Sequence, residues 1–176
     1  MVTEDQFRQG MSMLAGGVSL VTCAGRDGVW RGFTASDLCS VSLRPPMILV
    51  CLDRAAECHP SFQEAASFAV NVLARDDRQL AERFAAKGPA KFAGTSFEAG
   101  QLGAPVLPDA LSVIECRAAD RIALGDHTIL TGAVESVTTR DGEPLVYYAR
   151  DFWRLMEGEN ERRSRDHLIC STPGRA

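Results

Sequence analysis

The sequence contains no long hydrophobic run and no excess of positive charge. None of its apolar stretches approaches the roughly 18 residues that a membrane-spanning helix needs. The first residues, MVTEDQFRQG, are polar and acidic, whereas a secretory signal begins with basic residues that precede apolar ones. The formal net charge is −4, so a broad basic surface for nucleic acid or anionic lipid is not expected. These absences predict a cytoplasmic protein that binds neither membranes nor nucleic acid.

Several familiar catalytic motifs are also missing. None of the six cysteines forms a CxxC pair, and Cys58-His59 has no second ligand cluster to complete a metal site. There is no GxSxG elbow, and the histidines His59, His127 and His167 lie near no obvious nucleophile, which argues against a hydrolase. The paired carboxylates of a glycosidase are absent. Because no GxGxxG follows a strand, a nucleotide cofactor would have to bind without a Rossmann fold.

The 176 residues, of which 45% are hydrophobic, suffice for one sizeable core. Apolar spacing predicts helices at residues 3–14, 60–66 and 75–86 and a helical turn at 151–155. Strands are predicted at residues 18–23, 29–33, 47–52, 67–73, 112–124, 128–139 and 144–148. Because strands outnumber helices and the two do not alternate, we expect a mainly β fold, a barrel with peripheral helices. We predict one domain over residues 1–156 and a charged, flexible tail over 157–176.

The first segment that could carry chemistry is residues 34–42, which is rich in hydroxyl groups and small side chains. Residues 47–52, shortly after it, are an unbroken apolar run, which predicts a strand that is buried on both faces. Main-chain N–H groups and Ser or Thr hydroxyls can together hold a phosphate without a net positive charge. The alternative is an ordinary loop that leads into the strand.

Two further segments are candidates. Residues 125–128, Gly-Asp-His-Thr, place His127 at the tip of a predicted hairpin, where it could enter a cleft and where Asp126 could tune it. Residues 87–92 contain two lysines and a phenylalanine that could meet a phosphate and a ring. The alternatives are an exposed turn histidine and a solvated loop. Because the sequence shows no catalytic nucleophile, we expect a bound cofactor to supply the reactive group.

Five groups of residues, taken in their order along the chain, carry a resemblance to a known family. They read G-F-T-A-S with S-V-S-L-R-P-P, then F-A-V-N-V-L, then L-A-E-R-F-A with K-F-A-G, then G-D-H-T-I-L-T-G-A-V, and finally P-L-V-Y-Y. In this order they resemble the flavin reductase family of split β-barrel proteins, the reductase components of two-component flavin-dependent monooxygenases. The resemblance covers residues 3–155 approximately.

This resemblance implies a split β-barrel of the FMN-binding type. It implies an NADH-dependent flavin reductase that transfers hydride from NADH to FAD or FMN and supplies the reduced flavin to a partner monooxygenase. NADPH is the alternative donor, and a homodimer is the expected assembly. A non-catalytic flavin-binding protein and a flavin-dependent oxidase are the alternatives on the same fold.

The resemblance also implies roles for residues at the matching positions. Residues 32–36 would line the isoalloxazine edge, residues 40–42 the ribityl chain and phosphate, and residues 51–53 another border of the flavin. Residues 87–92 would close over the phosphate or adenine side. The expected flavin-binding residues are Gly32, Thr34, Ala35, Ser36, Asp37, Ser40, Val41, Ser42, Cys51, Leu52, Asp53, Lys87, Lys91 and Phe92.

The resemblance gives His127 the catalytic position, facing the nicotinamide and helping to seat NADH against the flavin. Asp37 and Leu38 depart from the family, which more often has a small polar residue followed by phenylalanine there. Asp37 therefore adds a negative charge to the expected flavin site. The connection at residues 53–56 is also less hydroxylated than is usual, and Arg54 could offset this loss by pairing with a phosphate.

Overall fold

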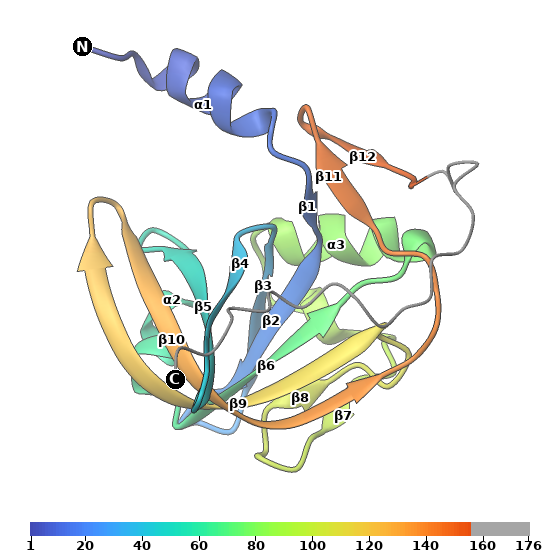
Figure 1. Ribbon diagram of the computed structural model, residues 1–176. Coiled ribbons are helices and arrows are strands. Elements are labelled where there is room, and N and C mark those ends of the chain that lie inside the picture. Colours follow the sequence, from blue (N-terminus) through green and yellow to red (C-terminus); the bar gives the residue numbers. More distant parts are fainter. Residues whose placement is uncertain (156–176) are drawn as a thin grey trace, which may run out of the picture.

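The computed structural model describes residues 1–155, which fold around one strongly curled antiparallel sheet (Figure 1). The strand order across this seven-stranded sheet is β3-β2-β6-β9-β10-β5-β4. Its strands are β2 (Ser19–Ala24), β3 (Trp30–Ala35), β4 (Leu38–Leu43), β5 (Pro46–Asp53), β6 (Ser67–Val72), β9 (Ser112–Leu124) and β10 (His127–Thr139). Only Ser36 and Asp37 join β3 to β4, although these strands are the two edges of the sheet. The sheet therefore curls into a barrel that stays open along one seam, which confirms the predicted split β-barrel.

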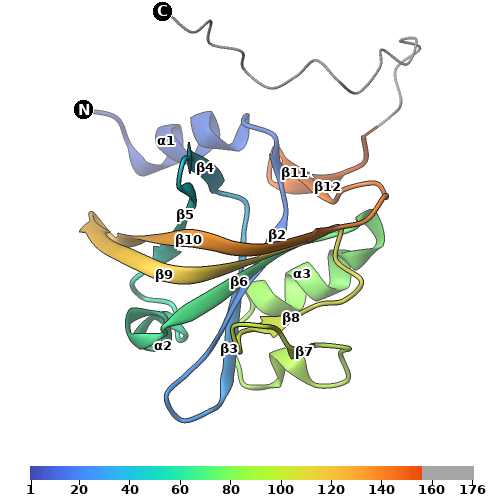
Figure 2. The same ribbon diagram turned by 60° about the horizontal axis from the view of Figure 1, so that its bottom comes forward.

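Helices and short strands surround this barrel (Figure 2). The helices are α1 (Glu4–Ser12), α2 (His59–Glu64) and α3 (Arg78–Ala85), and the short 3₁₀ helices are η1 (Arg75–Asp77) and η2 (Ala90–Phe92). The small sheets contain β1 (Gly16–Gly17), β11 (Val146–Tyr148) and β12 (Asp151–Trp153), and β7 (Glu98–Ala99) with β8 (Pro105–Val106). Among residues 1–155, no helix is both long enough and apolar enough to cross a membrane.

The helical turn predicted at residues 151–155 is wrong. The segment forms β12, which pairs antiparallel with β11 and places Phe152 opposite Tyr147. The two rings lie edge to face with centroids 5.3 Å apart, so a cross-strand aromatic pair favours the strand. The tail predicted at residues 157–176 lies outside the described residues.

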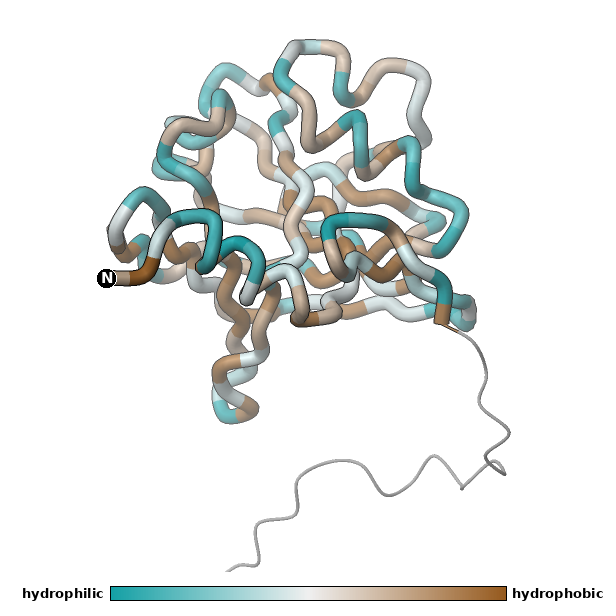
Figure 3. The backbone as a smooth tube through the Cα atoms, turned by 90° about the horizontal axis from the view of Figure 1, so that it is seen from above, coloured by the Kyte–Doolittle hydropathy of each residue, from teal (hydrophilic) through white to brown (hydrophobic). Residues whose placement is uncertain are grey.

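Two hydrophobic clusters lie on opposite faces of β2 and β6. Val21 and Phe33 belong to the cluster that includes Phe62 of α2, whereas Leu20 belongs to the cluster that includes Phe84 of α3. A continuous apolar run therefore corresponds here to central strands that are covered on both faces. Figure 3 shows hydrophobic positions along the central strands and polar positions along the surrounding loops.

The prediction that residues 47–52 are buried on both faces is wrong. Ile48, Val50 and Leu52 are buried, whereas Met47 and Cys51 on the other face are only half-buried. β5 lies next to the edge strand β4. The preceding serines also form a regular strand, β4, rather than a loop. Its register with β5 shifts between Ser40 and Ser42, as in a β-bulge.

A buried polar cluster ties three segments together at the centre of the sheet. The side-chain amide of Asn71 on β6 donates to the carbonyl of Leu20 at 3.1 Å and to the hydroxyl of Thr22 at 3.2 Å. Its side-chain oxygen accepts the main-chain N–H of Leu107 at 2.8 Å. Asn71 is fully buried, so these hydrogen bonds replace the water that it loses on folding.

The helix predicted at residues 3–14 is confirmed as α1, with Thr3 as its N-cap. Thr3 caps it with a reciprocal pair of hydrogen bonds to Gln6, at 3.0 and 3.2 Å. Its apolar stripe consists of Phe7, Met11 and Leu14, whose exposed fractions are 62%, 47% and 66%. α1 stands away from the barrel (Figure 1), so the described chain leaves this stripe uncovered.

Candidate functional site

A cleft of about 320 Å³ lies between β3, one edge of the open seam, and the end of β5, and we call it the seam cleft. One wall comes from β3 and the other from the end of β5 and the connection that follows it. The end of α3 and the loop after it form the floor and rim. The lining residues are Phe33, Thr34, Leu52, Asp53, Ala55, Ala56, Glu57, Cys58, Phe84, Ala85, Ala86, Lys87 and Lys91. The cleft therefore combines apolar walls with a small number of polar groups, as ligand sites commonly do.

The exposed edge of β3 presents main-chain groups to this cleft. The ammonium group of Lys91 donates to the carbonyl of Gly32 at 3.1 Å and to the carbonyl of Phe84 at 2.8 Å. The Gly32 carbonyl must then point away from β2. Because the N–H and C=O groups of one residue in an antiparallel strand face the same side, the N–H of Gly32 and the main-chain groups of Thr34 point there too.

Lys91 is held in place rather than free to move. Burial lowers the pKa of its ammonium group, and the nearby Cys58 and Glu57 act in the opposite direction. Its two hydrogen bonds connect η2 to β3 and to the end of α3. Lys91 therefore contributes a fixed positive charge to the wall of the cleft.

Two residues of β3 were expected to approach a ring, and the structure gives each a packing role as well. A Cβ atom added at Gly32 would lie 2.8 Å from Phe84 Cε1 and 3.0 Å from the carbonyl oxygen of Val21. The need for glycine at this position thus comes from the close packing of α3. The hydroxyl of Thr34 donates to the carbonyl of Ala81 at 2.6 Å, which ties the same strand to α3.

The rim of the seam cleft is closed by a side-chain contact between two loops. The carboxylate of Glu57 accepts the main-chain N–H of Gly88 at 3.0 Å, and Asp53 accepts the N–H of Ala55 at 2.8 Å. Asp53 thereby forms the side-chain turn that starts the connection between β5 and α2. Lys87 is exposed on the opposite rim, where its charge is available to a bound anion.

His127 adjoins the seam cleft without lining it. It begins β10 and pairs in register with Asp53 of β5. Its Nδ1 atom is 2.7 Å from a carboxylate oxygen of Asp126, and this hydrogen bond is the largest of the effects that lower the pKa of Asp126. Arg54 donates its main-chain N–H to the Asp126 carbonyl at 3.0 Å and its guanidinium to the Gly125 carbonyl at 3.4 Å. The turn that carries His127 is therefore fastened to the end of β5.

The structure brings some of the predicted site residues together. Thr34, Leu52, Asp53, Lys87 and Lys91 line the seam cleft, and His127 adjoins it through Asp53. A second cleft of about 320 Å³, the side cleft, shares Glu57, Cys58 and Lys91 with the first. Gly32 and Phe92 line this side cleft.

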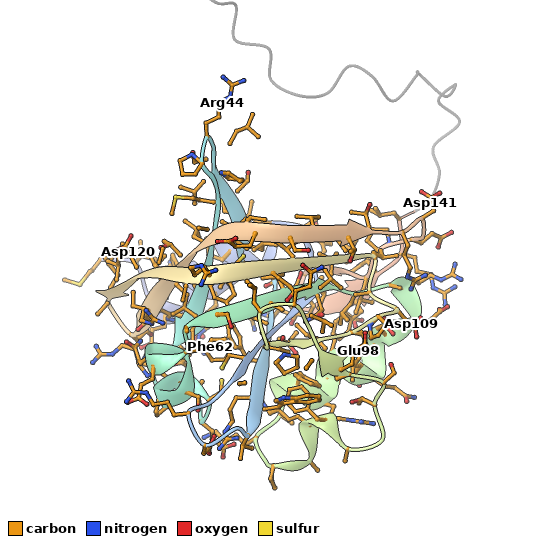
Figure 4. All side chains as sticks on the ribbon, turned by 90° about the horizontal axis from the view of Figure 1, so that it is seen from below. Arg44, Phe62, Glu98, Asp109, Asp120 and Asp141 are labelled. Carbon is orange, nitrogen blue, oxygen red and sulfur yellow. The ribbon has the colours of Figure 1, made fainter. Side chains whose placement is uncertain are left out.

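Other predicted residues lie elsewhere. Ser40, Val41 and Ser42 are on β4, toward the tip of the β4–β5 hairpin that Figure 4 marks with Arg44. Ser42 pairs with Met47, whereas His127 pairs with Asp53. Along β5 these two pairs are six residue steps apart, a distance of roughly 20 Å in an extended strand. A ligand in the seam cleft beside His127 is therefore far from Ser42.

Ser36 and Asp37 face a groove of about 490 Å³ beneath α1, which also includes Phe7, Tyr147 and Arg150. Burial, assisted by the charge of Asp37, raises the pKa of the half-buried thiol of Cys51. Asp37 and Cys51 are thus near one another but outside the seam cleft.

Ala35 and Phe92 have packing roles. Ala35 is buried in the barrel cluster. Phe92 packs edge to face against Trp30, Phe84 and Phe97, with ring centroids 5.7, 4.9 and 5.1 Å away.

The cleft residues that sequence reasoning missed are mostly small or apolar. Alanines at positions 55, 56, 85 and 86 carry no chemical signal in the sequence. For Glu57, the only sequence signal was its position in the polar connection after β5. The structure shows that its carboxylate joins this connection to Gly88 at the rim of the cleft.

The sequence and the fold both have close counterparts among known proteins. The chain matches the family model described as "Flavin reductase like domain" over residues 11–156. It is 46% identical over 153 residues to the actinorhodin polyketide dimerase of Streptomyces coelicolor, covering 86% of each chain. It is 40% identical over 154 residues to the NADH:riboflavin 5'-phosphate oxidoreductase of Streptomyces pristinaespiralis, covering 86% of this chain and 88% of that protein. Among solved structures, it resembles BorF, the flavin reductase component of a bacterial two-component tryptophan halogenase. The TM-score is 0.79 and the identity 33%, over 89% of this chain and 100% of BorF.

Proposed function

The chain belongs to the flavin reductase family, and from this premise we propose that it delivers reduced flavin to a separate monooxygenase. Its reaction is the reduction of a flavin by NADH, which makes it an NADH-dependent flavin reductase. The observation that carries the assignment of the site is the seam cleft, where apolar walls, main-chain donors and two lysines meet beside His127.

The residues of the seam cleft suit a flavin. Phe33, Leu52 and the alanines offer apolar surface to the ring system, whose polar edge needs hydrogen-bond partners. The edge of β3 supplies main-chain donors, and Lys91 holds a fixed positive charge nearby. Lys87 on the exposed rim suits the phosphate, because the flexible side chain of an exposed lysine can approach an anion with little movement of the backbone.

The bound flavin supplies the hydride acceptor, so the protein's own contribution is binding and orientation. The seam cleft would hold the ring with one face toward the end of the barrel where His127 begins β10. We assign His127 to the seating of the nicotinamide, since the bond to Asp126 and the fastening to Arg54 keep its imidazole in one place. Such fixed positioning of two reactants removes much of the entropy cost of the reaction.

Three finer features belong to the same proposal. We take NADH as the donor in preference to NADPH, and a flavin-dependent monooxygenase as the recipient, by analogy with a solved relative, nitrilotriacetate monooxygenase component B of Mycobacterium thermoresistibile. Residues 1–156 would act as one catalytic domain. Two chains would pair through surfaces that include the uncovered apolar stripe of α1, because a nine-residue helix is marginal without a packing partner.

Whether the flavin leaves the protein after reduction can be measured without the partner. Under anaerobic conditions, we expect NADH to reduce a large excess of FMN or FAD completely, with many flavins reduced per protein chain. Loss of the visible absorbance of oxidised flavin reports the reaction, and NADPH in place of NADH should give a much lower rate. Reduction that stops at one flavin per chain would instead indicate a bound prosthetic group, as in an oxidase, and would contradict delivery to a partner.

A further inference from the structure

One histidine of the described chain takes no part in the site described above. His59 begins α2, directly after the connection whose residues 55–58 line the seam cleft. Its side chain is half-buried and reaches β10, at a residue 69 positions further along the sequence. A polar ring that loses water on folding needs hydrogen-bond partners, so its contacts indicate what the ring does.

The imidazole of His59 meets two other polar side chains at a single ring atom. Its Nε2 lies 3.0 Å from the hydroxyl oxygen of Thr128 and 3.1 Å from the amide nitrogen of Gln63. The same amide nitrogen donates to the Thr128 hydroxyl at 3.4 Å. These three side chains therefore form a closed group between α2 and the start of β10, which we call the α2 cluster.

The chemistry of the α2 cluster fixes which of its groups donates. An amide nitrogen can only donate, so Nε2 of His59 accepts from Gln63 and carries no proton in this arrangement. The hydroxyl of Thr128 can donate to the same Nε2 while it accepts from Gln63. A neutral imidazole with its proton on Nδ1 thus satisfies every contact of the cluster.

A nucleophilic role for Thr128 does not fit this geometry. Its side chain is only 2% exposed, so a substrate has no access to the hydroxyl. Both contacts of the His59 ring are on the same nitrogen, whereas a catalytic base is oriented by a partner on the other one. The α2 cluster therefore acts by holding segments of the chain in place.

The α2 cluster joins a wall of the seam cleft to the strand that carries His127. On one side, His59 directly follows the cleft residues 55–58. On the other side, Thr128 pairs in register with Leu52 of the cleft and comes directly after His127. Because successive side chains of a strand point to opposite faces, the buried Thr128 is held on one face while His127 points to the other.

The start of β10 is thus attached at two points. At the turn, Arg54 donates its main-chain N–H to the carbonyl of Asp126 at 3.0 Å. On the buried face, the α2 cluster holds the hydroxyl of Thr128. Without the second attachment, this end of the strand could shift, and the ring of His127 would shift with it.

We propose that His59 is a positioning residue for hydride transfer, which keeps His127 in place for the nicotinamide by holding the hydroxyl of Thr128. This inference rests on the proposed function, because it takes the nicotinamide to lie beside His127. It adds α2 to the elements that build the site, and it links the wall of the flavin cleft to the residue that seats NADH.

Steady-state kinetics on single and double variants test this coupling. His59→Ala should raise the KM for NADH about fivefold, as the loss of one hydrogen bond of ordinary strength predicts, and should change the affinity for FMN less than about twofold. In the His127→Ala background, the same substitution should change the KM for NADH less than about twofold, because the group that it positions is then absent.

Conservative replacements separate positioning from a general loss of stability. Thr128→Val removes the hydroxyl and should raise the KM for NADH as much as His59→Ala does. Thr128→Ser keeps the hydroxyl and should stay within about twofold of wild type. Glu64→Ala is the control on α2 and should leave this KM unchanged, because Glu64 is exposed and pairs with Arg26 outside the cluster. If His59→Ala fails to fold, the two Thr128 variants test the same contact.

Two results would overturn the proposal. An unchanged KM for NADH in either His59→Ala or Thr128→Val would limit the α2 cluster to a role in stability. A full rise of about fivefold in the His127→Ala background would show that His59 acts independently of His127. Failure of the proposed function would look different, because it would appear in the wild type as reduction that stops at one flavin per chain.

Discussion

Replacing His127 with alanine should raise the KM for NADH about tenfold while leaving the affinity for flavin nearly unchanged. A tenfold change corresponds to about 1.4 kcal/mol, which is the usual size of one hydrogen bond between a protein and its ligand. His127 has a half-exposed side chain and pairs in register with Asp53 of the seam cleft, and its Nδ1 already interacts with Asp126. Its Nε2 is the atom that we expect to contact the nicotinamide. Steady-state kinetics with saturating flavin measure the KM, and a fluorescence titration measures flavin affinity.

The control for this experiment is Leu124→Ala. Leu124 pairs with His127 across the β9–β10 hairpin and is 60% exposed, so its truncation disturbs the same turn without removing the imidazole. We expect Leu124→Ala to leave the KM for NADH within about twofold of wild type, in line with the small effects of most surface substitutions. A His127→Ala protein with an unchanged KM, or with flavin affinity reduced as much as NADH affinity, would remove His127 from the nicotinamide site.

Replacing Asn71 with leucine should lower the free energy of unfolding by about 3 kcal/mol or more. The substitution leaves the N–H of Leu107 buried without its partner, which costs about 1–3 kcal/mol, and it removes the two buried hydrogen bonds that the side-chain amide donates to Leu20 and Thr22, each of which contributes about 1 kcal/mol. For a chain of this size, each kcal/mol shifts the melting temperature by about 2–4 °C, so we expect a decrease of roughly 6–12 °C. Thermal unfolding followed by circular dichroism measures this decrease.

The matched control lies on the same strand. The hydroxyl of Ser67 makes one hydrogen bond, to the carbonyl of Leu102 at 2.8 Å, so Ser67→Ala should cost only about 1 kcal/mol. If Asn71→Leu and Ser67→Ala had equal melting temperatures, the three bonds of Asn71 would not be a principal source of stability in the sheet.

The long strands and the barrel could be predicted from the sequence because their signals are local. Residues 112–124 and 128–139 are two long segments joined by a Gly-Asp-His turn, and the structure places β9 at Ser112–Leu124 and β10 at His127–Thr139. β12 was missed because three residues are too few to show a period, and because its partner β11 stabilises it from outside the segment. β4 was missed because its serines resemble a loop, although it pairs with β5 from Leu38 to Leu43 with one register shift.

The candidate site was harder to predict because its walls come from distant segments. The ammonium group of Lys91 donates to the carbonyl of Gly32, which lies 59 positions away in the sequence. No local sequence pattern predicts that contact. The association of His127 with Asp53 depends on the register of β10 against β5, which periodicity alone does not provide. The resemblance to a family suggested Asp37 as a flavin-site residue, whereas its placement beneath α1 required the fold.

The most direct test of the account is whether blocking the seam cleft abolishes flavin binding. Ala55 is exposed and lines that cleft, so Ala55→Trp should fill it while the chain still folds. Ala99→Trp, at an exposed position on β7 outside the cleft, is the control. In fluorescence titrations with FMN, wild type and Ala99→Trp should bind equally well, and Ala55→Trp should bind at least about a hundredfold more weakly, a loss of about 2.7 kcal/mol. Equal FMN affinities for all three proteins would contradict the assignment of the flavin to the seam cleft.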